Sequence, residues 1–132
     1  MTVNDLALLQ ERVNANPTLV RLGRWVSLEF LWGIGSTDYI IRLKQGRVGE
    51  VRARRLPTET GVFSVRAPRE VWLEHWQAQP KPEHHDLFSM LSAGRASLDG
   101  ETTPLMQNLI YFKGILAAPR EPGAADGRDR PA

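Results

Sequence analysis

Hydrophobic positions near the amino terminus recur at helical spacing. They predict an amphipathic first helix with an inward stripe of Leu6, Leu9 and Val13, which Leu8 widens. Thr2 or Asn4 can cap this helix, and Asn16–Pro17 ends or interrupts it. A second short helical turn is expected over 17–22, closed at Gly23.

From residue 24 onward the hydrophobic period becomes two, which is typical of half-buried strands. Four such segments are expected, over 24–34, 39–44, 48–55 and 63–67, and a shorter fifth strand contains Ala96 and Leu98. Segments rich in glycine, proline and polar residues separate them, as turns and loops require. Most of these strands alternate polar with apolar residues, so one face of their sheet is expected to be solvated.

Three further helices are predicted around the last two strands. They cover 69–77, 86–93 and a carboxyl-terminal segment that Thr103 caps and Pro119 stops, and Gly94 is expected to end the second in a left-handed conformation. The last helix carries an apolar stripe of Leu105, Leu109, Phe112 and Leu116, with Met106 and Ile110 beside it, all expected to face inward. The fold class is therefore α+β, a five-stranded, mainly antiparallel sheet with helices packed on one face.

Composition supports one domain and narrows the setting. The chain has 132 residues, 42% of them hydrophobic, and no cysteine, which excludes disulfides and thiolate metal sites and fits a reducing cytoplasm. No signal-peptide pattern opens it, and no apolar run approaches the about 20 residues that span a bilayer. We expect a cytoplasmic domain over 1–118. Residues 119–132 carry no large apolar side chain and are expected to form a disordered tail.

The segment His84-His85-Asp86 is the only cluster with a catalytic composition. Histidine beside a carboxylate can act as a general base, and two imidazoles can bind a metal. However, no nucleophile motif accompanies the cluster, and His75, nine residues away, fits no standard zinc spacing. The favoured interpretation is a helix start with Asp86 at its positive end. We therefore expect no enzyme, no metal and no cofactor.

Basic residues accumulate on the predicted strands. They are Arg42, Lys44, Arg52, Arg54, Arg55 and Arg66. Such a face could attract anionic lipid headgroups, phosphates or nucleic acid, or it could be a solvated face balanced by Glu29 and Glu50. It lacks the interleaved aromatic side chains that stack bases, and the formal net charge is only +2. We expect no nucleic-acid partner and at most transient contact with a membrane surface.

Large apolar side chains gather on the faces expected to turn inward. They are Phe30, Trp32, Tyr39, Trp72, Trp76, Phe88, Met90, Met106 and Phe112. Such residues form a dense core in most domains, and they also line ligand pockets. Composition does not separate these two alternatives.

One segment carries a family resemblance. Residues 94–101 read Gly-Arg-Ala-Ser-Leu-Asp-Gly-Glu and precede the leucine-rich segment Leu105–Leu116. This order resembles the sterol carrier protein type 2 (nonspecific lipid-transfer) domain, in which a glycine, a short strand ending in Gly-Asp or Gly-Glu, and a leucine-rich helix follow one another. The resemblance covers roughly 19–118, and the link over 80–86 departs from the family's general pattern.

The resemblance implies a function without catalysis. A sterol, fatty acyl or isoprenoid lipid would bind, or be transferred, in an apolar cavity between the sheet and the helices. It implies a ligand-binding set of Phe30, Trp32, Trp72, Trp76, Phe88, Leu91, Met106, Leu109 and Ile110. The alternative is an accessory subunit with the same fold and a filled core, which binds a protein partner through the basic face or the carboxyl-terminal tail.

Overall fold

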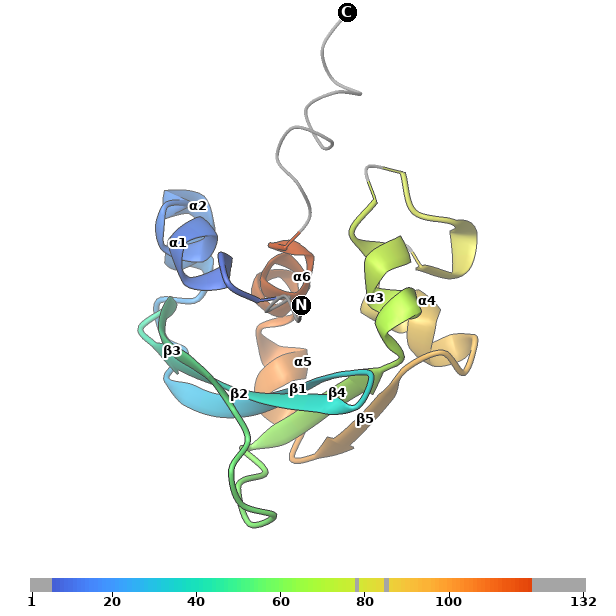
Figure 1. Ribbon diagram of the computed structural model, residues 1–132. Helices are drawn as coiled ribbons and strands as arrows, with labels where there is room; N and C mark the ends of the chain where they lie inside the picture. Colours follow the sequence, from blue (N-terminus) through green and yellow to red (C-terminus); the bar gives the residue numbers. More distant parts are fainter. Residues whose placement is uncertain (1–5, 78, 85, 120–132) are drawn as a thin grey trace, which may run out of the picture.

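Five strands form one sheet, and helices precede, interrupt and follow them. The computed structural model describes residues 6–77, 79–84 and 86–119 (Figure 1). The strands are β1 (Leu28–Ile34), β2 (Thr37–Lys44), β3 (Arg47–Ala53), β4 (Phe63–Ala67) and β5 (Ser97–Gly100). The helices are α1 (Leu9–Asn14), α2 (Pro17–Leu22), α3 (Arg69–His75), α4 (Leu87–Ser92), α5 (Thr103–Gln107) and α6 (Leu109–Ala117), with a 3-10 turn η1 (Pro82–His84).

The sheet order is β3-β2-β1-β4-β5. β1 and β4 run parallel, while the other three neighbouring pairs are antiparallel. In Figure 1 the helices α1, α2, α3, α4 and α6 lie on one side of the sheet, and the loop over 54–62 lies on the other. The predicted α+β class, the five strands and the single helical layer are confirmed.

The two faces of β1 differ less in burial than its sequence predicts. Phe30 and Trp32 point toward the helices, but Leu31 on the opposite face is also fully buried. Its register partner on β2, Ile40, is 2% exposed. Beside Ile40, Arg52 of β3 forms an ion pair with Glu59 in the loop over 54–62, at 2.6 Å. The centre of the sheet is therefore buried on both faces, which a period of two does not predict.

The predicted last helix is broken into α5 and α6. Asn108 leaves the helical conformation, with φ −128° and ψ 41°, and its side-chain amide donates to the Pro104 carbonyl at 2.9 Å. Because the break turns the face of α6, Tyr111 and Ile115 are buried along with Phe112 and Leu116. The expected inward orientation of two residues is wrong: Met106 is 44% exposed and Ile110 is 64% exposed.

The amino-terminal helices follow the sequence pattern with one exception. Leu6, Leu9 and Val13 are buried as predicted, but Leu8 is 48% exposed. The Asn14 side chain holds α1 on β3, since its amide donates to the Val48 carbonyl and its oxygen accepts from the Val48 N–H. The predicted caps at Thr2 or Asn4 and the predicted tail beyond Pro119 lie outside the described residues.

Among the described residues, no helix has the length and apolar character that crossing a membrane requires.

Candidate functional site

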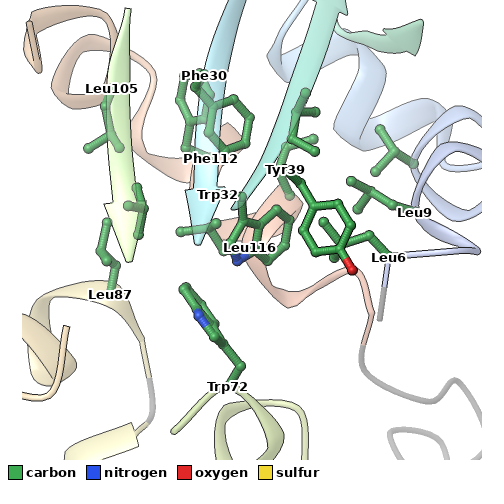
Figure 2. Close-up of a cluster of buried hydrophobic side chains, with 14 of the residues drawn as sticks. Leu6, Leu9, Phe30, Trp32, Tyr39, Trp72, Leu87, Leu105, Phe112 and Leu116 are labelled. Atoms are coloured by element: carbon green, nitrogen blue, oxygen red, sulfur yellow. The ribbon is translucent and has the colours of Figure 1, made fainter. Parts of the chain in front are cut away.

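Aromatic rings fill the space between the sheet and the helices. β1 supplies Phe30 and Trp32, α3 supplies Trp72, and Trp76 directly follows α3; Figure 2 shows Trp72 pointing toward Trp32. Trp32 lies edge-on to both of these indoles, with centroid distances of 5.4 Å and 6.3 Å. Phe30 packs on Phe63 of β4 at 5.2 Å and on Phe112 of α6 at 5.8 Å. These distances are those of direct aromatic packing.

The polar edges of these rings meet backbone carbonyls, with one exception. Trp72 Nε1 donates to the Gly33 carbonyl and Trp76 Nε1 to the Leu116 carbonyl, both at 2.9 Å. Trp32 Nε1 is fully buried and finds no acceptor among the residues that the structure describes. A buried donor without an acceptor costs about 1–3 kcal/mol of stability. An oxygen atom of a bound molecule would remove this cost.

A pocket of about 260 Å³ opens between α4 and α6. Its lining residues are His75, Asp86, Leu87, Lys113, Gly114, Leu116 and Ala117. Leu87 and Leu116 belong to the buried core, so the apolar wall of the pocket is continuous with the aromatic interior. The volume lies just under the about 300–1,000 Å³ of typical small-molecule sites.

A charged pair lines this pocket, and an aromatic ring lies beside its cation. Lys113 Nζ lies 3.4 Å from Asp86 Oδ2 and 5.6 Å from the centroid of the Phe88 ring. Asp86 also accepts a hydrogen bond from the Ser89 backbone N–H at 2.9 Å. That bond, and then Lys113, lower the pKa of Asp86, so this carboxylate stays ionised at neutral pH. The lining of the pocket thus combines a charged pair with apolar side chains.

The predicted histidine cluster has a structural role where it is described. Asp86 caps α4, as expected. His75 is 3% exposed, and its Nδ1 lies 2.8 Å from the His84 carbonyl. Since a carbonyl only accepts, Nδ1 carries the proton and holds η1 on α3. His85 lies outside the described residues, and no group of three metal-ligating side chains occurs in the part of the chain that is described.

Carboxylates neutralise most of the predicted basic face. Arg42 pairs with Glu29 at 3.0 Å and with Glu50 at 3.9 Å, and Arg52 pairs with Glu59. Arg54 and Arg66 share Asp38, at 3.1 Å and 3.4 Å. This arrangement is the charge-balanced alternative that the sequence left open, but the face is only partly solvated, because the loop over 54–62 covers its centre.

The predicted ligand-binding residues separate into three groups. Phe30, Trp32, Trp72 and Trp76 come together in the buried aromatic cluster, and Leu91 and Leu109 are half-buried against the core. Phe88 is half-buried beside Lys113. Met106 and Ile110 lie on the exposed side of α5 and α6. The pocket-lining residues Lys113 and Ala117 were not predicted, because neither lies on the expected inward stripe of Leu105, Leu109, Phe112 and Leu116.

Comparison with known proteins identifies the fold. No protein-family model and no curated protein matches the chain. Among solved structures, sterol carrier protein 2 superposes with a TM-score of 0.71 at 14% identity, covering 91% of this chain and 96% of that chain. A possible sterol carrier protein from Thermus thermophilus gives 0.64 at 12% identity, covering 94% and 92%. The ubiquinone synthesis protein UbiJ-SCP2 gives 0.54 at 15% identity, covering 96% and 89%. The chain therefore has the sterol carrier protein 2 fold.

Proposed function

We propose that this protein binds one apolar molecule, of the sterol, fatty acyl or isoprenoid class, and carries it without chemical change. The observation that carries the proposal is the pocket between α4 and α6, whose apolar wall continues into the aromatic interior. The fold supports the same class of ligand, because neighbours that share it are sterol carrier proteins and a ubiquinone synthesis protein.

The ligand enters past Lys113 and Phe88 with its apolar part leading. Burying about 300 Å² of hydrocarbon contributes roughly 7 kcal/mol before the cost of association, at about 25 cal/mol per Å². The polar end stays at the mouth, where the Lys113 ammonium can bind a carboxylate or a hydroxyl. Because the pocket measures only about 260 Å³, a long chain requires the α3 and α6 side chains, Trp76 and Leu116 among them, to move apart.

Two donors suit an oxygen-bearing ligand. Lys113 at the mouth exchanges its contact with Asp86 for the ligand's polar end. Deeper inside, the unpaired Trp32 N–H takes an oxygen that reaches the interior, such as a ring hydroxyl or a carbonyl. A hydrocarbon without oxygen gains neither interaction, so it should bind more weakly than an alcohol or acid of equal length.

The test is a side chain that fills the pocket from α6. Ala117→Phe places a ring in the space between α4 and α6, and we expect at least a tenfold loss of affinity for cis-parinaric acid, read from its fluorescence. The matched control is Ala93→Phe, the same substitution at an exposed position that follows α4. It should bind the probe like the unaltered protein.

Both variants must retain the cooperative thermal unfolding of the unaltered protein for the comparison to hold. Equal binding of the probe by both variants would contradict the proposed site. No binding by the unaltered protein, to either a fatty acid or a sterol probe, would contradict the proposed function and favour a scaffold with a filled core.

A further inference from the structure

One end of the molecule is built from two turns that hydrogen-bond to each other. The β2–β3 turn donates from Gly46 N–H to the Val26 carbonyl at 3.1 Å and from Gln45 N–H to Ser27 Oγ at 3.0 Å. Tyr111 of α6 fixes the same turn, since its hydroxyl donates to the Gly46 carbonyl at 2.7 Å. The chain that links α2 to β1 and the β2–β3 turn therefore form one rigid surface, at the left of Figure 1.

Six side chains of this end define what we term the basic tip. They are Arg21, Leu22, Arg24, Trp25, Lys44 and Arg47. All four cations are exposed, and none forms an ion pair within residues 6–77, 79–84 and 86–119. The arginines of the outer sheet face differ, because each of Arg42, Arg52, Arg54 and Arg66 has a carboxylate partner there.

Two positive charges of the tip lie directly opposite each other on neighbouring strands. Lys44 and Arg47 are register partners across the β2–β3 hairpin. Like charges directly opposite on neighbouring strands destabilise a hairpin. An anionic surface facing the turn would relieve this repulsion, and nothing in the described fold does so.

Exposed apolar side chains lie among these cations. Trp25 is 82% exposed, whereas Trp32, Trp72 and Trp76 are at most 9% exposed. The Arg24 guanidinium carbon lies 5.4 Å from the Trp25 ring centroid, and the neighbouring Leu22 is 45% exposed. Tryptophan beside arginine and lysine is the combination that favours the headgroup region of a bilayer, where the ring enters the boundary and the cations bind phosphates.

We propose that the basic tip docks this protein on the surface of an anionic lipid bilayer. Trp25 and Leu22 enter the headgroup boundary, and Arg21, Arg24, Lys44 and Arg47 lie over the lipid phosphates. A nucleic acid fits the tip less well, because the surface offers one aromatic ring rather than a row of stacking platforms. The inference uses no residue of the α4–α6 pocket, so it stands or fails separately from the proposed function.

Trp25 itself reports docking. Because the other three tryptophans are buried, the emission of the full-length protein should shift to shorter wavelength with vesicles of 3:1 phosphatidylcholine and phosphatidylglycerol, and not with phosphatidylcholine alone. Trp25→Phe should abolish this shift. Equal shifts with both kinds of vesicle, or none with either, would overturn the proposal.

The charge requirement is tested by Lys44→Glu, with Lys81→Glu as the matched control. Both change the net charge equally, but Lys81 is exposed on the link between α3 and η1, away from the tip. Lys44→Glu should fold well, since it places a carboxylate opposite Arg47. It should lower partition onto the anionic vesicles at least about fivefold, the effect of one cation at a membrane surface.

Lys81→Glu and Ala117→Phe should partition like the unaltered protein. If Lys44→Glu and Lys81→Glu lose partition equally, the effect is one of net charge and the tip is not the docking surface. Binding to a single-stranded oligonucleotide in place of vesicles would equally overturn the membrane assignment.

Discussion

Replacing Gly23 by alanine should destabilise the joint that places α6 on the sheet. A Cβ atom at this position would lie 2.5 Å from Cδ1 and Cζ of Tyr111, where carbon atoms normally approach to about 3.5–4.0 Å. The ring cannot move away freely, because Tyr111 is 1% exposed and its hydroxyl donates to the Gly46 carbonyl at 2.7 Å. Gly23→Ala therefore forces a buried ring out of place.

Three effects contribute to the change in the free energy of unfolding on Gly23→Ala. Overpacking a well-packed core costs about 1–3 kcal/mol. Weakening the Tyr111 hydrogen bond costs up to about 1 kcal/mol. The loss of chain freedom in the unfolded state offsets about 0.4–1 kcal/mol, since φ at Gly23 is −101° and alanine adopts that conformation without strain. With each effect at the middle of its range, we expect a net loss of about 2 kcal/mol, or about 5–10 °C in Tm for a chain of this length.

The assay is urea and thermal unfolding followed by circular dichroism, with Gly49→Ala as the matched control. At Gly49 the nearest atom to an added Cβ is the Arg42 carbonyl oxygen at 3.8 Å, an ordinary contact on an exposed strand position. The control should leave the free energy of unfolding within about 0.5 kcal/mol of the unaltered protein, the usual range for surface changes. If Gly23→Ala also stays in that range, the packing of Tyr111 against residue 23 is wrong.

Three further predictions concern Asp86, Glu59 and Met106. Asp86→Ala should lose about 1 kcal/mol of stability in urea because it removes the α4 cap, whereas Asp86→Asn should keep most of it; equal losses would contradict the capping role. The Arg52 side chain, with the Arg55 and Leu56 N–H groups, lowers the pKa of Glu59 to about 2 from an ordinary 4.5, so its stabilisation is present above pH 4.5 and is lost as the pH falls toward 2. The urea midpoint of the unaltered protein should fall more steeply across that window than that of Glu59→Gln, and identical slopes would refute this assignment. Met106→Trp should change Tm by less than about 2 °C because Met106 is 44% exposed, and a large loss would mean that it packs inward.

The strands could be predicted from sequence because their signal is local. The alternation of Phe30 and Trp32 with Glu29 and Leu31 predicted β1, but the strand begins at Leu28 and not at residue 24. Gly94, which follows α4, has the left-handed conformation that the sequence indicates, with φ +72°. The order of the strands does not follow from such patterns. The parallel pairing of β1 with β4 and the burial of Leu31 on the outer face both depend on contacts between distant segments.

The last helix shows where periodicity fails. The spacing of Leu105, Leu109 and Phe112 fits one continuous helix, but the Asn108 side chain bonds to Pro104 and the backbone leaves the helical conformation. Asparagine side chains compete with helical hydrogen bonds in this way. The turn of α6 that follows leaves Ile110 exposed. Met106 precedes the break and is exposed on α5, where Leu105 holds the buried position.

The aromatic part of the candidate site could be predicted, and its mouth could not. Phe30, Trp32, Trp72 and Trp76 lie at inward positions of their own strand and helix, so local patterns identify them. The contact between Lys113 and Asp86 joins residues 27 positions apart, and neither residue has a local signal for it.

The most direct test of the central claim is a native mass spectrum of the protein purified from its own host without detergent. We predict a species heavier than the bare chain by one apolar molecule, released by organic solvent and absent from Ala117→Phe purified in parallel. A spectrum of the bare chain alone, or an equal adduct on both proteins, would contradict the claim that the pocket between α4 and α6 holds an apolar ligand.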